Sequence, residues 1–506
     1  MRELVAPIPL WRGWGLPLGY RQAAALLVGI VLVARIAILF TADYNLNPDE
    51  AQYWSWSKDL AFGYFSKPPM IAWLIALTTA VFGDSEAAIR LAAPLLHAAT
   101  AFAVFALARS LYDERVAFWS CLVYFTVPAV WFSSGLITTD VPLLLFWCLA
   151  LLALHRTLET RSMAWATALG VAVGLGMMSK YAMLYFAICG GLYLGVCRRD
   201  RWLLWSRQGL LAVVIAILLS LPNILWNLDN HLATVGHTTA NAGWNAGLFN
   251  ADEFLEFFTA QFGVFGPLLF CALIWGLITL RHRLQERADV YLVCFVAPVL
   301  AIVMLQAFIS HANANWAATA YVAAAILVVV WLLRHRRLAW AVPASVAIHT
   351  ALGMILYALV LSPSLADGLG RDNDFKQVRG WDVMGAAVAE MASKGYHGKA
   401  YSAVLTDDRF VHTSLLYYGR PHQQPVVMWN GDGLAQNHYE LTTPYKSSLG
   451  TPLLFTTERS ETEAEPILSR FREHRLLETL EIPIGGEKTR VIRLFALHGL
   501  RDGAHE

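Results

Sequence analysis

The sequence predicts a polytopic all-α membrane protein with about 11–13 transmembrane helices, followed by a small C-terminal α/β domain outside the membrane. Three observations lead to this fold class. The chain of 506 residues is 57% hydrophobic and 15% charged, whereas an average soluble domain carries about 25% charged residues. Apolar stretches of membrane-spanning length recur between residues 22 and 361. Beyond them, charged residues become frequent and the apolar runs shorten to strand length.

A helix needs about 20 mainly apolar residues to cross a bilayer. The stretches that approach this length lie at 22–41, 88–110, 116–134, 141–158, 163–179, 182–197, 208–226, 259–280, 289–309, 316–333 and 338–361. The first stretch is too long for the apolar part of a cleavable signal peptide, so it is interpreted as a retained span. The shorter apolar stretch 69–83 is predicted to be a re-entrant or interfacial helix in the first large loop.

Arginine is concentrated in alternate loops between these stretches. One set of loops contains Arg2, Arg12, Arg21, Arg109, Arg115, Arg156, Arg161, Arg198, Arg199, Arg201, Arg207, Arg281, Arg283, Arg287, Arg334, Arg336 and Arg337. The opposite set contains Lys58, Lys67, Arg90 and Lys180. Because cytoplasmic loops are rich in Lys and Arg, the N-terminus is predicted to be cytoplasmic. The loops 42–87 and 227–258 and the C-terminal part are then periplasmic, in a multi-pass protein of the bacterial inner membrane.

The chain is predicted to divide near residue 364 into a transmembrane domain, 1–364, and a periplasmic α/β domain, 365–506. Strand-length apolar runs in the second part lie at Ala400–Leu405, Pro425–Trp429, Pro452–Thr456 and Val491–Leu497. Helical patterns lie between them at 376–394, 408–418 and 462–474. This alternation of strand and helix predicts a partly parallel sheet.

Asp49-Glu50, in the loop after the first span, is the most informative motif of the chain. In the structural interpretation, Pro48 begins a helix and the two carboxylates complement the helix dipole in its first turn. In the functional interpretation, Asp49 is a general base that takes the proton of an attacking hydroxyl. Charged groups at the mouth of a membrane bundle are costly to hold unless they are used.

Lys67, Asp140 and Lys180 lie on the same predicted side of the membrane. Lys67 either extends to lipid head groups or holds its positive charge next to a phosphate. Asp140 either caps the following helix or is a second acid in the same cavity as Asp49. Lys180 is either an interfacial anchor or a buried cation that needs an anion.

His237 and Asn315 lie in two further loops on this side, together with other amides and aromatic residues. Such loops either bind a sugar or form an ordinary interfacial belt. No His or Cys cluster has the spacing of a metal site.

Together these motifs resemble those of the polyprenyl-phosphate-sugar-dependent glycosyltransferases of the GT-C fold, families 39 and 83. These families include the lipid A aminoarabinose and galacturonic acid transferases and are related to the protein O-mannosyltransferases. The resemblance covers about residues 1–360. It rests on Asp49-Glu50-Ala51-Gln52-Tyr53, Ser66-Lys67-Pro68-Pro69, Thr139-Asp140, Ser179-Lys180-Tyr181, Pro222 with Trp226-Asn227, and Asn313-Ala314-Asn315-Trp316.

The resemblance implies roles for these residues. Asp49 matches the catalytic acidic residue of the families, Asp140 the second acidic position, and Lys67 the lysine near the lipid phosphate. Glu50 and Tyr53 match positions that shape the same loop. The predicted catalytic residues are therefore Asp49, Glu50 and Asp140, and the predicted substrate-binding residues are Tyr53, Lys67, Lys180, His237 and Asn315.

Two positions depart from the aminoarabinose transferases. Gln52 stands where those enzymes carry an Arg, which removes a phosphate contact. Ser66 stands where they carry a Glu, which removes a metal ligand. The sequence therefore assigns no cofactor and leaves a divalent cation as an open alternative.

The favoured hypothesis is a periplasmic-face glycosyltransferase that moves one sugar, with inversion, from a polyprenyl phosphate to lipid A or core lipopolysaccharide, or to another envelope glycan. The alternatives are a flippase or transporter of lipid-linked sugars and a protein O-glycosyltransferase of the same fold. A further alternative is a receptor whose C-terminal domain binds envelope partners through Arg409, Tyr417, Tyr418 and Trp429. The net charge of +1 does not suggest a nucleic-acid partner.

Overall fold

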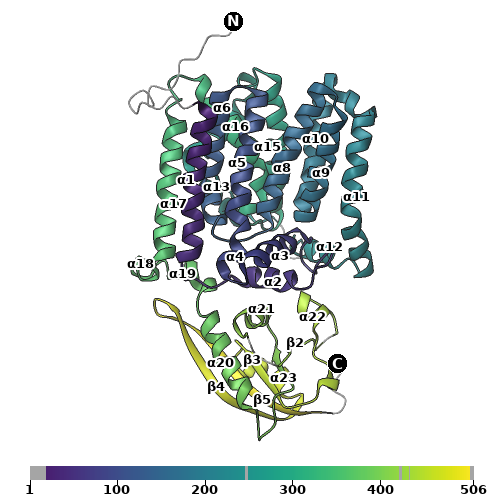
Figure 1. Cartoon of the computed structure of the whole chain (residues 1–506), viewed down its shortest axis with the longest axis vertical. Coiled ribbons are helices and arrows are strands. Elements are labelled where there is room, and N and C mark those ends of the chain that lie inside the picture. Colours follow the sequence, from purple (N-terminus) through teal and green to yellow (C-terminus); the bar gives the residue numbers. More distant parts are fainter. Residues whose placement is uncertain (1–18, 245–248, 421–423, 432, 502–506) are drawn as a thin grey trace.

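The computed structural model describes residues 19–244, 249–420, 424–431 and 433–501. Three layers follow one another along its longest axis (Figure 1). They are a bundle of long apolar helices, a thin layer of short helices, and a C-terminal domain built on a sheet. The end of the bundle that meets the C-terminal domain is called the domain side below, and the opposite end is called the far side.

Helices that are long and apolar enough to cross a membrane form most of the bundle. Among the described residues there are seven. They are α1 (Tyr20–Thr41), the nearly continuous pair α4 (Glu86–Arg90) and α5 (Ala92–Leu111), α8 (Asp140–Thr160), α11 (Arg207–Asp229), α15 (Arg287–Ile309), η5 (Ala314–Ala317) continued by α16 (Ala318–Arg334), and α17 (Ala341–Leu361). The chain is therefore a multi-pass membrane protein, as its composition predicts.

The predicted count of 11–13 spans is too high by this measure, because four apolar stretches are broken or short. The stretch 116–134 breaks before Pro128 into α6 (Glu114–Thr126) and α7 (Pro128–Ser133), since proline restricts the residue before it and cannot donate to the preceding turn. The stretch 259–280 bends by 117° at Gly266, between α13 (Ala251–Phe265) and α14 (Pro267–Ile278). If that pair counts as one span, there are eight among the described residues.

The other two of these stretches are helical but shorter than 18 residues. They form α9 (Met163–Ser179), and η2 (Tyr181–Met183) with α10 (Leu184–Val196). Figure 1 shows α9 and α10 beside the long helices of the bundle. Two short 3-10 helices, η3 (Arg198–Trp205) and η4 (Leu280–His282), connect helices on the far side.

The thin layer contains α2 (Pro48–Ser57), α3 (Met70–Phe82) and α12 (Ala233–Ala240), which lie at the domain side of the bundle (Figure 1). With 13 residues, α3 is too short to cross a bilayer. The apolar stretch predicted at 69–83 is therefore a short helix at the end of the bundle, and its re-entrant or interfacial position stays a prediction. The layer separates the bundle from the C-terminal domain and carries the Asp49-Glu50 motif.

The C-terminal domain contains a mixed sheet with the strand order β2-β1-β3-β5-β4. Its strands are β1 (Ala403–Thr406), β2 (Val426–Met428), β3 (Leu453–Thr457), β4 (Phe471–Gly485) and β5 (Lys488–Leu500). The first three strands are parallel, and β5 runs antiparallel to both β3 and β4. The predicted α/β domain with a partly parallel sheet is therefore confirmed.

Both faces of this sheet are covered. Val404, Leu454 and Ile492 face the helices α20 (Trp381–Lys394) and α21 (Arg409–Tyr418), while Leu405 and Phe455 pack on the side of α23 (Glu461–Leu468). The remaining short elements are α18 (Pro363–Gly368), α19 (Asp372–Phe375), η6 (Lys376–Val378), α22 (His438–Thr442) and η7 (Ser447–Leu449).

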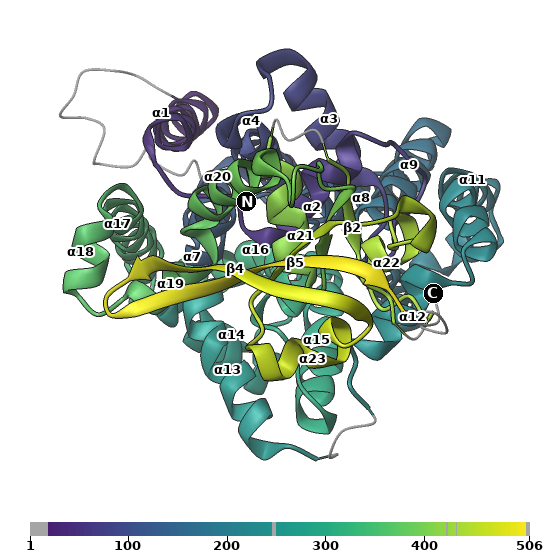
Figure 2. The same cartoon turned by 90° about the horizontal axis from the view of Figure 1, so that it is seen from below.

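Strand β4 is the strand of the sheet that was not predicted from the sequence. The helix predicted at 462–474 ends at Leu468 as α23, and the chain enters β4 at Phe471. Most side chains of β4 are exposed, because it is the edge strand of the sheet and follows its neighbour β5 in a long hairpin (Figure 2). An edge strand with polar side chains lacks the apolar alternation by which strands are recognised.

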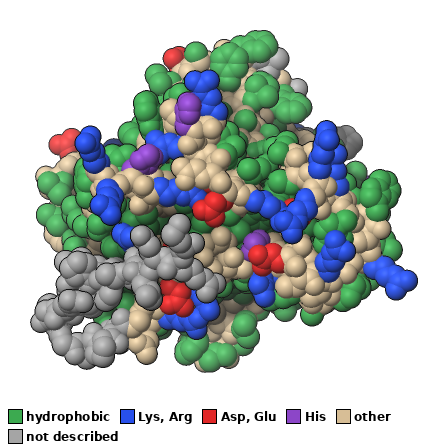
Figure 3. All heavy atoms as spheres, turned by 90° about the horizontal axis from the view of Figure 1, so that it is seen from above, with side chains coloured by type: hydrophobic (Ala, Val, Ile, Leu, Met, Phe, Trp, Pro, Cys, Tyr) green, Lys and Arg blue, Asp and Glu red, His purple; other side chains and the backbone are tan. Residues whose placement is uncertain are grey.

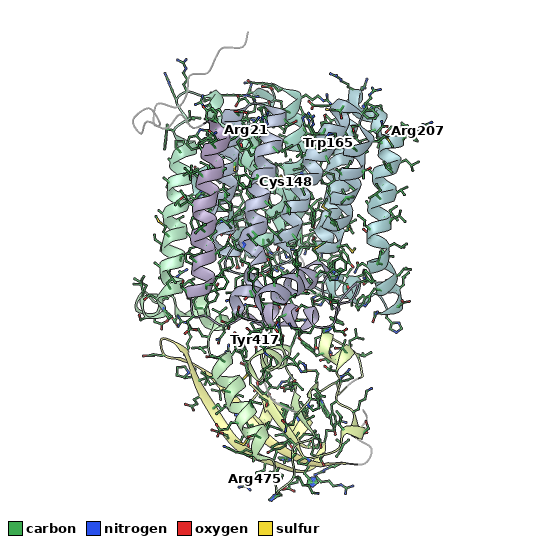
Figure 4. All side chains as sticks on the ribbon, viewed as in Figure 1. Arg21, Cys148, Trp165, Arg207, Tyr417 and Arg475 are labelled. Atoms are coloured by element: carbon green, nitrogen blue, oxygen red, sulfur yellow. The ribbon has the colours of Figure 1, made fainter. Side chains whose placement is uncertain are left out.

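The C-terminal domain is hydrogen-bonded to the thin layer. The Asn45 amide donates to the carbonyl of Val378 at 2.9 Å, and the Asn45 side-chain oxygen accepts from the Trp381 amide at 2.8 Å. The Tyr417 hydroxyl donates to the carbonyl of Asp84 at 2.8 Å, and Figure 4 labels Tyr417 at this junction. Residues far apart in the sequence are thus held together at the domain side.

The far side carries the arginines of the loops that are predicted to be cytoplasmic. Figure 3 views this end and shows Lys and Arg side chains spread over it. Figure 4 labels Arg21 and Arg207 there, and Arg21 pairs with Glu114 at 3.0 Å. Arg2 and Arg12 lie outside the described residues.

Candidate active site at the domain side of the bundle

The start of α2 directs its two carboxylates to different environments. Asn47 caps the helix, accepting a hydrogen bond from the Asp49 amide at 3.0 Å, and Pro48 is the first helical residue. The side chain of Asp49 is 52% exposed, whereas that of Glu50 is 2% exposed. The helix start that was predicted in the structural interpretation is therefore present. Of the two carboxylates, Glu50 is buried and Asp49 is at the surface.

Glu50 forms a buried ion pair with Arg90. The Arg90 Nη2–Glu50 Oε2 distance is 2.8 Å, and Arg90 Nε lies 3.0 Å from Oε1. The amides of Ile137 and Asn47 also donate to this carboxylate, each at 3.0 Å. Arg90 in turn donates to the carbonyl of Asn45 at 2.8 Å. Glu50 thus joins α2, α4 and the segment before α8, and this arrangement fixes the position of Asp49.

Asp49 is paired with a residue of the C-terminal domain. Arg409 Nη1 donates to Asp49 Oδ1 at 2.7 Å and also to the side-chain oxygen of Gln52. Asp408 caps α21 through the amides of Phe410 and Val411, so Arg409 is the first helical residue and lies over α2. From the sequence, Arg409 is predicted only as part of a surface of the C-terminal domain. The chain separation of 360 residues hides this contact from local patterns.

A second group joins three of the predicted residues. Lys180 Nζ donates to Asp140 Oδ1 at 2.7 Å, and Asn315 Nδ2 donates to Asp140 Oδ2 at 2.7 Å. Asp140 is the first residue of α8, and the residue that precedes the helix is Thr139. The carboxylate therefore does not cap its own helix, and both of its oxygens are occupied.

Lys67 lies in a loop that is held at several points. Its carbonyl accepts from the Tyr64 amide at 3.1 Å, and the Thr234 hydroxyl of α12 donates to the Tyr64 carbonyl at 2.7 Å. Burial lowers the pKa of the Lys67 ammonium, and the positive charge of Lys180 lowers it further. Asp49 and Asp140 oppose this shift, so both carboxylates lie within electrostatic reach of Lys67.

Tyr53 and His237 are neutral groups beside these charges. Burial holds the pKa of Tyr53 well above its usual value, and Asp49 adds to the shift. Burial together with Lys67 and Arg409 lowers the pKa of His237 to about 4. The His237 ring packs edge-on against Phe65, with centroids 5.6 Å apart. Asn245, one of the amides that accompany His237 in the predicted outer loop, lies outside the described residues.

The residues around Lys67 carry one more positive than negative charge. The charged cluster consists of Asp49, Lys67, Asp140, Lys180 and Arg409. Asp49 pairs with Arg409, and Asp140 pairs with Lys180. Within the described part of the chain, Lys67 forms no ion pair. An anion such as a phosphate would neutralise this extra charge. A partly buried lysine without an ion-pair partner, such as Lys67, favours a ligand of this kind.

An apolar cavity of about 610 Å³ leads to this cluster. Asp140 and Asn315 are among its few polar lining residues, and most of the others are apolar side chains of α7, α8, α13, α16 and α17. Such a cavity suits a lipid chain whose polar end reaches the cluster. In the residues that the structure describes, no group of three or more His, Cys, Asp and Glu side chains is arranged to hold a metal ion.

Comparisons with known proteins identify relatives of the chain. The family model "Dolichyl-phosphate-mannose-protein mannosyltransferase" matches residues 66–226. Lipid A galacturonosyltransferase RgtD of Rhizobium johnstonii is 33% identical over 444 residues, which are 87% of this chain and 91% of RgtD. An undecaprenyl phosphate-alpha-4-amino-4-deoxy-L-arabinose arabinosyl transferase of Pseudomonas fluorescens is 31% identical over 237 residues, 42% of this chain and 41% of that protein.

The fold has a solved counterpart. ArnT of Cupriavidus metallidurans bound to undecaprenyl phosphate superposes with a TM-score of 0.65 at 14% identity, covering 93% of this chain and 97% of ArnT. In the apo state the TM-score is 0.64. The similarity to RgtD over nearly the whole length, together with this fold, shows that the chain belongs to the GT-C glycosyltransferases that use polyprenyl-phosphate sugars.

Proposed function

We propose that this protein transfers a single sugar from a polyprenyl-phosphate donor to lipid A or core lipopolysaccharide, with inversion at the anomeric carbon. The relation to RgtD over 87% of the chain supports the acceptor class. The observation that carries the proposal is the charge balance of the cluster, in which Lys67 has no counter-ion among the described residues. The phosphate of the donor supplies the missing negative charge.

The reaction is a single displacement. The acceptor hydroxyl oxygen forms a bond to the anomeric carbon while the bond from that carbon to the phosphate oxygen breaks. The polyprenyl phosphate leaves with the electron pair, and Lys67 stabilises the charge that develops on it. Asp49 takes the proton of the acceptor hydroxyl. No nucleotide and no covalent enzyme intermediate are needed.

Asp49 suits the base better than Asp140 does. Both oxygens of Asp140 accept hydrogen bonds, from Lys180 and Asn315, so its role is to hold Lys180 near the phosphate. Asp49 has one oxygen engaged by Arg409, and its side chain is half exposed. A carboxylate with a free oxygen at the surface of the cluster is able to meet an incoming hydroxyl.

The remaining predicted residues position these groups or contact the sugar. Glu50 is a positioning residue, because both oxygens of its carboxylate already accept hydrogen bonds from Arg90 and from two backbone amides. Tyr53 keeps its proton near neutral pH because its pKa is raised. His237 stays uncharged because its pKa is lowered. They offer neutral hydrogen-bonding groups, which is what sugar hydroxyls need.

We place the domain side in the periplasm and the N-terminus in the cytoplasm. The support is the contrast between the two ends of the bundle. The far side carries the arginine-rich loops, and cytoplasmic loops are enriched in Lys and Arg. Lipid A and its polyprenyl-linked sugar donor then meet the charged cluster from the outer leaflet of the inner membrane.

Donor binding is expected to weaken as the pH rises through the lowered pKa of Lys67. A lysine with a lowered pKa becomes neutral at a lower pH than a free lysine does, and the neutral amine no longer attracts phosphate. Lys67→Met should raise the donor KM by about 10- to 100-fold, the effect of losing a charged hydrogen bond. Initial rates measured between pH 7 and 10 give the KM profile.

Lys67→Arg is the matched control, because arginine stays charged over this whole pH range. It should remove the alkaline rise in KM while keeping most of the donor affinity. A KM for Lys67→Met equal to that of the wild type at every pH would show that the phosphate binds elsewhere.

Arg409→Gln is expected to lower kcat/KM for sugar transfer by about 10- to 100-fold, because Asp49 loses the partner that orients it. Arg420→Gln is the control. Arg420 belongs to the same interface and stacks on Trp54 and Tyr417, but it does not contact Asp49. Thermal unfolding midpoints show whether both variants remain folded. Equal losses in the two variants would assign Arg409 to domain docking rather than to orientation of Asp49.

The decisive test is transfer by purified protein. A panel of radiolabelled polyprenyl-phosphate sugars is mixed with lipid A–core acceptor, with Asp49→Asn as the control. Label that moves to the lipid acceptor only with wild-type protein supports the proposal and identifies the sugar. Label on protein instead would favour a protein O-glycosyltransferase. Transbilayer movement of the donor in proteoliposomes without product would favour a flippase.

A further inference from the structure

Arg35 lies inside the bundle, away from the charged cluster. It belongs to α1, six residues before that helix ends at Thr41, which is about 9 Å along the axis at 1.5 Å per residue. The residue is 1% exposed. Ionisable residues within membrane helices are expensive to keep and most often serve a function.

The guanidinium of Arg35 is incompletely paired. Its Nη2 donates to the carbonyl of Phe125 at 2.7 Å, and its central carbon lies 4.1 Å and 4.5 Å from the ring centroids of Phe125 and Trp131. Within the part of the chain that the structure describes, the Nε and Nη1 groups have no partner in hydrogen-bond geometry, and the neutral Tyr357 hydroxyl is their polar neighbour. No carboxylate of the described residues forms an ion pair with Arg35. Aromatic faces compensate part of a buried charge, but they leave these two donors unused.

Arg35 lines a pocket of about 160 Å³. The walls come from α1, from α17 and from the chain around Gly135, and Asn47 and Gln377 contribute at the domain side. A single water needs only about 10–15 Å³ in a cavity, so this pocket has room for a phosphate group. None of the eight predicted site residues lines it.

The other polar groups of this pocket do not neutralise Arg35. The Tyr44 hydroxyl donates to the carbonyl of Gly135 at 2.6 Å, and the Tyr357 hydroxyl donates to the carbonyl of Trp131 at 3.2 Å. Asp374, the acidic lining residue, pairs with Arg371 at 2.5 Å. The pocket therefore keeps an unmatched positive charge.

The pocket lies at the edge of the bundle. It lies between α1 and α17, which are peripheral helices with most of their surface outside the bundle (Figures 1 and 2). Phe132 and Leu356 line both this pocket and the 610 Å³ apolar cavity that contains Asp140. A ligand at Arg35 thus has apolar space next to it, which suits a lipid better than a water-soluble anion.

We infer that the Arg35 pocket is a second anion site, which binds the phosphate headgroup of a membrane lipid separately from any phosphate at Lys67. The guanidinium supplies two unpaired charged donors among the described residues, and phosphate is the anionic group that many membrane lipids carry in their headgroups. Peripheral placement between α1 and α17 gives the lipid a lateral entrance. This inference concerns binding and does not depend on the proposed transfer reaction.

The test uses the full chain in a neutral maltoside detergent, with Lys67→Met as the background so that the cluster does not contribute. Native mass spectrometry counts bound didecanoyl phosphatidic acid during a titration. Didecanoylglycerol, which has the same chains without phosphate, and inorganic phosphate are titrated in parallel. We expect one saturable phosphatidic acid, no comparable binding of the diacylglycerol, and binding of inorganic phosphate that is at least tenfold weaker.

Arg35→Gln is expected to weaken this binding at least tenfold, and Arg35→Lys to restore part of it. Val360→Trp fills the pocket from α17 without changing Arg35, and it should weaken binding to the same extent. Arg21→Gln, on the same helix but at the far side, is the matched control and should bind as the background does. Unfolding midpoints of each variant exclude loss of fold.

Three results would overturn the inference. The first is unchanged binding in both Arg35→Gln and Val360→Trp. The second is loss of all phosphatidic acid binding in the Lys67→Met background, which would place the lipid phosphate at Lys67. The third is equal affinity for inorganic phosphate or for the diacylglycerol, which would make the ligand a free anion or an apolar chain.

Discussion

Replacing Asp49 with Asn is expected to lower kcat/KM for sugar transfer by about 10²- to 10⁴-fold, the usual contribution of a general base. Asparagine keeps the size of the side chain but cannot take a proton. The fold should be retained, because Asp49 is half exposed and Arg409 partly exposed, and such surface pairs are worth at most about 1 kcal/mol. The measurement is the initial rate of label transfer together with the thermal unfolding midpoint.

Asp59→Asn is the control for this variant, because Asp59 is exposed in the same loop outside the charged cluster. It should transfer sugar at nearly the wild-type rate. If Asp49→Asn retained transfer within threefold of the wild type, proton removal would have to be assigned to another group, and Asp140 would be the next variant to test.

Glu50→Leu is expected to lower the free energy of unfolding by about 3–5 kcal/mol, the usual cost of leaving one partner of a buried ion pair alone. Arg90 would remain buried without its carboxylate, and the amides of Asn47 and Ile137 would lose their acceptor. Denaturant unfolding in detergent micelles measures the loss. Transfer should fall together with the folded fraction.

A double-mutant cycle separates this pairing from the contacts that each residue makes alone. Glu50→Leu combined with Arg90→Leu should destabilise the protein by less than the sum of the two single variants, because the double variant leaves no unpaired charge. Additive losses would contradict a direct coupling and would assign the cost to the backbone contacts of each side chain.

Much of the architecture follows from local composition. Apolar length alone predicts that helices such as α1, α15 and α17 cross a membrane, because only a helix satisfies its own backbone in lipid. The short apolar runs of the C-terminal part predict β1, β2 and β3 closely. The breaks at Pro128 and Gly266 were not predicted, since hydropathy averages over a break and reports a continuous span.

The candidate site was predicted in part. Asp49, Lys67, Asp140, Lys180 and Asn315 were chosen from motifs, and the structure brings them into one neighbourhood at the domain side. Their roles as catalytic and substrate-binding groups stay predictions that the variants above address. The sequence did not predict that Glu50 is buried and Asp49 is exposed. Adjacent residues of a helix point in different directions, and only packing decides which one is buried.

The sequence by itself determined that this is a membrane bundle with a polar domain at one end, and which residues can carry charge at that end. Hydrophobicity and residue chemistry are local properties, so they can be read along the chain. Only the tertiary structure decided which charges are paired. The contacts of Arg409 with Asp49 and of Glu50 with Arg90, and the isolation of Arg35, arise where distant segments meet. The free energy of a charge depends on the partners that folding places around it.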